Sequence, residues 1–363
     1  MLVIGGGTFG LFTALTLADR GAEVILIDRG GVWREASSVN AGSLGVQNKL
    51  PALVPYTLWA WELWLGLEAR LGCNLDVRRN GGYKVATTED EAQRLKTVAA
   101  EQEARGLTVS HLCGDDIRRE APWLGDCVVA ATYSPDDGYA SPTLLGPALR
   151  RAVEDGGVTV VEHGDVVSLS AGSRPRVETS AGAFEADAVA ITAGAWSGQL
   201  AMMVGAILPV TLDVNMVSVT ERAPTTIPKI VTHARGILTL KQVANMSCLI
   251  GGGWQGIGTL SDSRKEIDYD QLVHNLRLAQ RVIPGLARLN VVRSWAGYEG
   301  VTPDSLPYLG RLPGQPNVYC GACARGGFTL GPLMGRLLGE LIADGITSRP
   351  IDLFDPGRFM SGH

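Results

Sequence analysis

The stretch "LVIGGGTFGLFTALTLADRGAEVILIDRG" (residues 2–30) carries the pattern that decides the fold of the N-terminal part of the chain. A short apolar strand leads into three glycines with the spacing GxGxxG. Gly5 allows a tight turn, Gly7 lets the backbone approach a pyrophosphate, and Gly10 lets a helix pack closely on the strand. The stretch therefore predicts a βαβ unit that binds a dinucleotide.

The residues after the glycines complete this pattern. A helix is expected over residues 11–19, and a second strand over residues 23–27 ends at Asp28. A carboxylate about 20 residues beyond the glycines can accept a hydrogen bond from a ribose 2′-hydroxyl group. Asp28 therefore argues against a 2′-phosphate, and so against NADP, but it does not separate NAD from FAD.

The composition narrows the class of protein. The chain has 363 residues, 45% of them hydrophobic, and a net charge of −5, with Lys and Arg scattered along it. This length suggests about two domains, and the scattered charge does not favour nucleic-acid binding. No apolar run reaches the ~18 residues of a transmembrane helix. Six cysteines without a dense framework or a signal peptide indicate a cytoplasmic protein. Peripheral attachment to the inner membrane stays an open alternative.

The order of the predicted elements indicates two discontinuous domains. Strand and helix patterns of the α/β kind occur at both ends and in the middle of the chain, and two segments with an antiparallel pattern lie between them. We therefore predict an α/β, Rossmann-like dinucleotide domain and an α+β substrate domain with a mainly antiparallel sheet. The first is expected to comprise residues 1–78, 141–212 and 291–363, and the second residues 79–140 and 213–290.

A second stretch, "WAGYEGVTPDSLPYLG" (residues 295–310), is rich in glycine and proline, so we expect an irregular loop. It contains Glu299, which has three interpretations: a group that caps or pairs within the fold, a reader of a cationic group on the substrate, or a residue at a second subunit. A buried carboxylate without a partner is costly, so each interpretation requires a partner.

Two further features suggest no metal or redox site. Cys320 and Cys323 are spaced as CxxC, but iron–sulfur clusters usually need four thiolates, so two buried thiols are the default. The five histidines show no metal-binding spacing, and we expect no metal site.

Taken in order, "VIGGGTFG", "ASSVNAGSL", "ITAGAWS", "TPDSLPYLG" and "GGFTLGP" resemble the D-amino-acid oxidase superfamily of flavoproteins over nearly the whole chain. The stretches "DGYASP", "VTERAP", "YEGVTPD" and "ARGGFTLGP" look closer to the β subunits of heteromeric opine oxidases, D-hydroxyproline dehydrogenase and hydrogen cyanide synthase. The resemblance implies a FAD-binding domain of the D-amino-acid oxidase/glutathione-reductase type and extended, non-covalent FAD.

The resemblance also implies which residues surround the cofactor and the substrate. The residues expected to contact FAD are Gly5, Gly7, Thr8, Phe9, Gly10, Asp28, Arg29, Ser37, Ser38, Asn40, Ala41, Gly42, Val166, Ala193, Gly194, Trp196, Gly297, Gly326, Gly327, Phe328 and Thr329. The residues expected at the reacting end are Arg325 as a carboxylate anchor, Glu299 and Tyr298. Glycine oxidase places a carboxylate-binding arginine where this chain has Glu299, which cannot take that role.

The implied reaction is the oxidation of a C–N bond to an imine by hydride transfer to the flavin. The substrate would be an amino acid or an N-substituted amino acid, such as an opine, D-hydroxyproline or proline. The resemblance favours a catalytic subunit that passes electrons to a partner subunit, with a further flavin or iron–sulfur cluster at or in that partner. The alternatives are a self-sufficient glycine or D-amino-acid oxidase that uses O₂, and a non-catalytic flavoprotein subunit.

Overall fold

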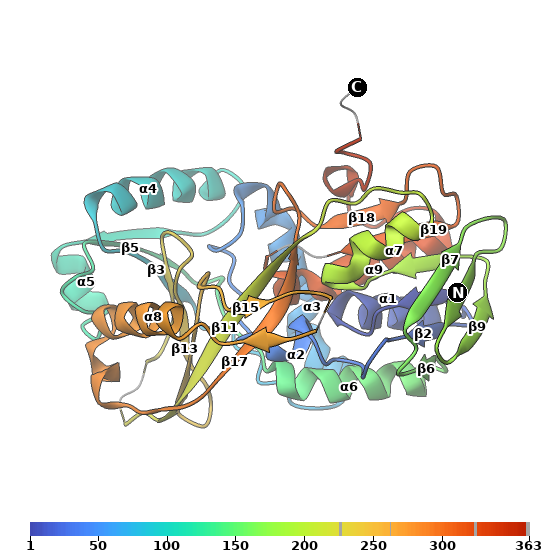
Figure 1. The fold of residues 1–363 in the computed structure, drawn as a ribbon. Coiled ribbons are helices and arrows are strands. Elements are labelled where there is room, and N and C mark those ends of the chain that lie inside the picture. Colours follow the sequence, from blue (N-terminus) through green and yellow to red (C-terminus); the bar gives the residue numbers. More distant parts are fainter. Residues whose placement is uncertain (225–226, 262, 323–324, 361–363) are drawn as a thin grey trace.

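The computed structural model describes residues 1–224, 227–261, 263–322 and 325–360. Two large sheets lie side by side, each with its own set of helices (Figure 1). The helices are α1 (Thr8–Asp19), α2 (Ala36–Val39), α3 (Val54–Leu71), α4 (Glu89–Glu103), α5 (Asp115–Glu120), α6 (Pro142–Asp155), α7 (Ser197–Met203), α8 (Tyr269–Val282) and α9 (Gly327–Asp344).

The first sheet has six strands and includes the predicted βαβ unit. In spatial order its strands are β18 (Tyr308–Arg311), β19 (Val318–Ala322), β10 (Val189–Ile191), β1 (Leu2–Ile4), β2 (Ile25–Ile27) and β6 (Thr159–Val161). The strands are parallel except β18, which runs antiparallel to β19. A separate antiparallel sheet is formed by β7 (Val166–Ser170), β8 (Arg176–Thr179) and β9 (Gly182–Glu185).

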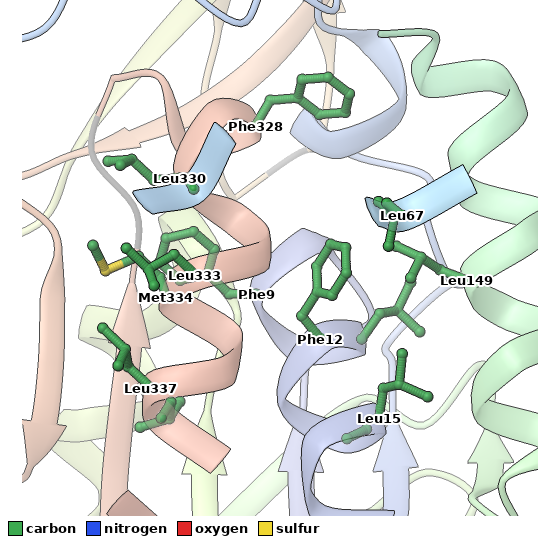
Figure 2. Close-up of a cluster of buried hydrophobic side chains, with 14 of the residues drawn as sticks. Phe9, Phe12, Leu15, Leu67, Leu149, Phe328, Leu330, Leu333, Met334 and Leu337 are labelled. Carbon is green, nitrogen blue, oxygen red and sulfur yellow. The ribbon is translucent and has the colours of Figure 1, made fainter. Parts of the chain in front are cut away.

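Helices α1 and α9 pack against each other beside this sheet. Their apolar side chains form one buried cluster with residues of α3 and α6 (Figure 2). Gly331, Gly335 and Gly339 recur on one face of α9, and a Cβ atom at Gly331 would lie 1.9 Å from Thr8 Cγ2. Because Thr8 begins α1 and Gly331 lies in the first turns of α9, this close packing brings the N-termini of both helices together.

The second sheet has eight strands and is mainly antiparallel, so the predicted fold class is confirmed. In spatial order its strands are β17 (Val291–Val301), β11 (Thr211–Arg222), β14 (Ser247–Gly251), β13 (Thr239–Gln242), β12 (Ile230–His233), β3 (Gly82–Ala86), β5 (Ala130–Ser134) and β4 (Ser110–Cys113). Only the pair β12 and β3 is parallel among these described strands. Strands β15 (Ile257–Gly258) and β16 (Lys265–Glu266) form a small separate hairpin.

Two expectations from the sequence need correction. Helix α1 begins at Thr8, not at residue 11. The first half of the stretch 295–310 is not an irregular loop, because it belongs to β17 and pairs with β11. Its glycines are explained by close neighbours: a Cβ atom at Gly297 would lie 2.2 Å from Val39 Cγ2, and one at Gly300 would lie 2.8 Å from the Ala195 Cα atom.

Strand β17 also bears on the proposed domain division. The boundary proposed between residues 290 and 291 falls at the start of β17, which runs through residue 301 in the eight-stranded sheet. The strand therefore connects the second sheet directly to the cavity described below, and its Glu299 lies at the junction of the two parts.

Candidate functional site

A cavity of about 1020 Å³ extends between the two sheets. Its wall includes the glycine turn before α1, the segment around α2, the turn after β10, part of β17 and the start of α9. A cavity of this size is at the upper end of the range for small-molecule sites, ~300–1000 Å³. It is large enough for an extended ligand.

The glycine turn has the geometry that the sequence predicts. A Cβ atom at Gly10 would lie 1.8 Å from the Gly5 carbonyl oxygen, so only glycine lets α1 approach β1 this closely. Gly5 has a φ of +108°, which a side chain rarely adopts. Gly7 borders the cavity, and the nearest atom to its Cβ position is Ser37 Oγ at 3.1 Å. The turn is therefore tight on the protein side and open on the cavity side.

Ser37 contacts the first residue of α1 through its hydroxyl group. The backbone N–H and the hydroxyl group of Thr8 both lie 2.9 Å from Ser37 Oγ. A helix N-terminus leaves N–H groups without partners and carries a partial positive charge, so it favours phosphate groups. Thr8, Phe9 and Ser37 all line the cavity at this point, where a pyrophosphate would fit.

Asp28 and Arg29 also line the cavity, but both have protein partners. The Asp28 carboxylate accepts hydrogen bonds from the backbone N–H groups of Gly6, at 2.7 Å, and Gly30, at 2.9 Å. A carboxylate offers about four acceptor positions, so Asp28 can still accept from a ribose hydroxyl. The Arg29 guanidinium stacks 3.8 Å from the ring centroid of Trp196.

The segment from α2 to Ser43 is held against the cavity by contacts that the sequence did not predict. Lys241 Nζ of β13 donates to the Ala41 carbonyl oxygen. The Thr329 hydroxyl donates to the Ser43 carbonyl oxygen at 3.1 Å, and Trp295 Nε1 donates to that of Val39 at 2.7 Å. Lys241 is only 2% exposed, and burial lowers its pKa to about 7. A buried lysine is rare enough that neither spacing nor periodicity could have signalled it.

Most of the other predicted cofactor residues also border the cavity. These are Asn40, Ala41, Gly42, Val166, Ala193, Gly194, Trp196, Gly326, Gly327 and Phe328. Four predicted residues do not line it: Gly10, Ser38, Gly297 and Thr329. They act on the protein side instead, since the Ser38 hydroxyl donates to the Glu35 carbonyl oxygen and Thr329 accepts a hydrogen bond from Trp64 Nε1 at its carbonyl oxygen.

The residues present fit an extended dinucleotide. Trp196 lines the cavity, and its Nε1 is a buried donor without a hydrogen-bond partner among the described residues. Gly194 has a φ of +53° and no atom within 4 Å of its Cβ position. An unsatisfied donor and an open glycine on the wall of the same cavity as the phosphate-binding turn fit a bound group with its own acceptors.

Glu299 lines the cavity from β17, and its carboxylate has partners within the protein. Its carboxylate accepts from Asn215 Nδ2 at 2.5 Å and from the backbone N–H of Gly326. Burial raises the pKa of Glu299, while Arg325 and Lys49 oppose that shift and Asp213 adds to it. The structure thus gives Glu299 the partners that every interpretation required, at a point where the side chain also borders the cavity.

Arg325 and Tyr298 line the same part of the cavity but are engaged by other groups. Arg325 Nη2 lies 2.5 Å from Asp213 Oδ2, and half of the Arg325 side chain is exposed. The Tyr298 hydroxyl lies 2.5 Å from the carbonyl oxygens of Thr259 and Arg264, to either of which it can donate. Tyr298 therefore contributes its ring, rather than its hydroxyl group, to the cavity wall.

The sequence analysis missed a buried charged cluster next to Glu299. It contains Lys49, Lys84 and Asp137, all at most 9% exposed. Burial lowers the pKa values of Lys49 and Lys84 to about 8 and raises that of Asp137. The Asp137 carboxylate accepts from the backbone N–H of Val46 at 2.6 Å and from the Gln47 side chain at 2.9 Å. The stretch "GVQNKL" around Lys49 offers no pattern that marks this cluster.

The sequence raised two further candidate centres, the Cys320–Cys323 pair and a metal site. Burial raises the pKa of the Cys320 thiol to about 12, which keeps it protonated, and Cys323 lies outside the described residues. The described part of the chain holds no group of three or more His, Cys, Asp or Glu side chains that could bind a metal ion. In the same residues, no helix is long and apolar enough to cross a membrane.

Comparisons with known proteins agree with this geometry. Residues 1–341 match the family described as DAO, FAD dependent oxidoreductase. Glycine oxidase of Geobacillus kaustophilus is 29% identical over 94% of this chain and 92% of that protein. An opine oxidase subunit of Rhizobium meliloti is 26% identical over 99% of this chain and 97% of that protein.

A solved structure of a related protein supports the same family assignment. L-proline dehydrogenase from P. horikoshii superposes with a TM-score of 0.90 at 26% identity, covering 100% of this chain and 98% of that one. The relatives thus include proteins named for three different amino-acid-like substrates, and the cavity's own residues have to distinguish between them.

Proposed function

Because the chain belongs to the DAO family of FAD-dependent oxidoreductases, we propose that it is the catalytic subunit of a dehydrogenase for an N-substituted or cyclic amino acid. The substrate class comprises opines, D-hydroxyproline and proline-like compounds, and the product is an imine. FAD, held by the residues around the glycine turn and the start of α9, would supply the acceptor for the hydride from the substrate carbon. The protein's own residues bind the substrate and orient its C–N bond.

The observation that carries this proposal is the pairing of opposite charges at the reacting end of the cavity. A secondary amine is protonated in water, and Glu299 places a carboxylate in the wall beside Gly326. Cationic groups for a substrate carboxylate lie close by, and Arg325 is the one expected from the sequence. Orientation by such charged groups supplies much of the rate enhancement when the cofactor performs the chemistry.

The proposal includes a partner protein as the acceptor of electrons. The likeness to the opine oxidase subunit of Rhizobium meliloti supports it, since that relative is named as one subunit of an assembly. A further flavin or iron–sulfur cluster would then lie at or in the partner, and a cytoplasmic location suits this assembly.

The second candidate is a self-sufficient oxidase that uses O₂ and releases H₂O₂. The likeness to glycine oxidase of Geobacillus kaustophilus favours it. The two candidates differ in what the purified, FAD-loaded chain does in air with glycine, proline, D-hydroxyproline and an opine. The dehydrogenase reduces an artificial dye without forming peroxide. Stoichiometric peroxide with glycine would replace our proposal with the oxidase.

A further inference from the structure

We infer that Lys49, and not Arg325, holds the carboxylate of the substrate. This inference rests on the proposed function, since it assigns a role at the same cavity. Lys49 was not singled out from the sequence. It lies on the segment between Ser43 and η1 (Pro51–Leu53).

The first observation is the position of the Lys49 side chain. It lines the cavity, and a Cβ atom at Gly326 would lie 2.3 Å from Lys49 Nζ. Gly326 is the N-cap residue of α9 and donates its N–H to Glu299. The Lys49 ammonium group therefore lies where the helix N-terminus and β17 meet.

The second observation is that this ammonium group, on a largely buried side chain, has no partner among the described residues. Lys49 is 8% exposed, and no hydrogen-bond acceptor or carboxylate of the described residues pairs with its Nζ atom. An unpaired buried charge is costly, and an anion in the cavity would offset that cost. Lys49 thus presents to the cavity an ammonium group that has no counter-ion among the described residues.

The neighbouring acidic groups do not fill that role, because no ion pair or hydrogen bond joins either of them to Lys49 Nζ within the described residues. Asp137 accepts from backbone and side-chain N–H groups of residues 46 and 47. Glu299 accepts from Asn215 and Gly326. Both act on Lys49 only at longer range, where they favour its charged form.

The other cations at this end are partnered or exposed. Arg325 is paired with Asp213 and half exposed. Lys84 Nζ donates to the Gln47 carbonyl oxygen at 2.9 Å. Replacing either contact by a substrate carboxylate would require breaking an existing bond, whereas Lys49 gains a partner without losing one.

The position of Lys49 along the cavity favours the substrate over the cofactor phosphates. The phosphate-binding turn at Gly5–Gly10 lies at the N-terminus of α1. The cavity wall also includes Lys84, Arg94 and Val98, which belong to the segment predicted as the substrate domain, and Lys84 lies close enough to Lys49 for their charges to interact. An anion at Lys49 would therefore lie beside Gly326 and close to the charged residues of the predicted substrate domain.

The test uses acetate as a carboxylate probe and acetamide as its uncharged counterpart. Both are titrated into the oxidised, FAD-loaded protein while flavin absorbance is followed, so no turnover is needed. Lys49→Met should weaken acetate binding at least ~10-fold, the loss expected for a charged hydrogen bond, and leave acetamide unchanged. Arg325→Met should weaken acetate binding less than ~3-fold, and Lys96→Met, on the exposed face of α4, should have no effect.

The inference is overturned if Arg325→Met costs as much acetate affinity as Lys49→Met. It is also overturned if Lys49→Met shifts the flavin midpoint potential and leaves acetate binding intact, because Lys49 would then serve the cofactor. If Lys49→Met does not retain FAD, Lys49→Arg decides instead. Its guanidinium should preserve acetate binding above about pH 9, and a pH profile identical to wild type would reject the role. If the wild-type protein binds acetate as predicted but oxidises none of the amines, only the proposed function would be rejected.

Discussion

The ammonium group of Lys49 lies against the backbone of Gly326, the residue that precedes helix α9. The contact is so close that a Cβ atom at Gly326 would lie 2.3 Å from Lys49 Nζ. It joins the segment that follows Ser43 to the N-terminus of α9 and places a charge in the cavity wall, at the point where we propose that substrate and cofactor meet.

The first prediction concerns the pH dependence of carboxylate binding. Burial lowers the pKa of Lys49 to about 8, with Asp137 and Glu299 opposing that shift. The ammonium form binds a carboxylate and the neutral amine does not, so acetate affinity should be constant below about pH 7. It should then fall ~10-fold per pH unit above about pH 8.

Acetate titrations across this pH range check the predicted fall in affinity. Lys84 and Arg94 also face the cluster, and the pKa of Lys84 is likewise lowered to about 8, so Lys49→Arg serves as the control. If the fall in affinity persists in Lys49→Arg, the titrating group is Lys84, and our assignment of the pH dependence to Lys49 is wrong.

A second prediction concerns Glu299. Glu299→Gln keeps a side chain that can accept from Asn215 but removes a negative charge from the wall. Acetate should therefore bind about 3- to 10-fold more tightly at pH 7, because one repulsive neighbour is gone. Protonated amines should bind more weakly by a similar factor. Glu101→Gln, on the exposed face of α4, is the matched control. Weaker acetate binding in Glu299→Gln would contradict the proposed charge pairing.

A third prediction concerns Lys241, which is buried and donates a hydrogen bond to the Ala41 carbonyl oxygen. Burial lowers its pKa from 10.5 to about 7, so between these pH values the unfolded state binds more protons than the folded state. The free energy of unfolding should then rise with pH over this range. Lys241→Met should lack this rise, so its stability relative to wild type should decline by a few kcal/mol from pH 7 to 10. Urea unfolding at several pH values measures the free energy of unfolding of both proteins. If the two free energies change in parallel with pH, Lys241 does not titrate in this range.

A fourth prediction separates two glycines of the turn. Gly10→Ala places a methyl group 1.8 Å from the Gly5 carbonyl oxygen, which should force α1 from β1 and lower the free energy of unfolding by ~2 kcal/mol or more. Gly7→Ala meets only Ser37 Oγ, at 3.1 Å, so the fold should survive while FAD binds at least ~10-fold more weakly. Thermal unfolding and flavin titration distinguish them, and equal damage to the fold from both substitutions would refute this division.

The dinucleotide half of the site could be predicted from the sequence because local spacing determines it. The turn Gly5–Gly10 and Asp28 need only their neighbours in sequence to be interpreted, whereas the role expected for the start of α9 comes from the family resemblance. The charged end depends on contacts between distant segments, such as Lys49 with Gly326 and Arg325 with Asp213. No periodicity encodes these contacts.

The stretch around Glu299 shows the same limit in secondary structure. Its glycines indicated a loop, but pairing of β17 with β11 outweighs their weak strand propensity. Tertiary neighbours, and not local preference, explain why glycine is required at residues 297 and 300.

Anaerobic reduction of the bound flavin tests the central claim most directly. The purified, FAD-loaded chain is mixed without oxygen with glycine, proline, D-hydroxyproline and an opine, and its visible absorbance is followed. We predict rapid bleaching with at least one of the N-substituted or cyclic amino acids, slower bleaching with glycine, and slow return of colour on admitting air. A flavin that stays oxidised with every amine, or one that bleaches fastest with glycine and reoxidises at once in air, would contradict the account.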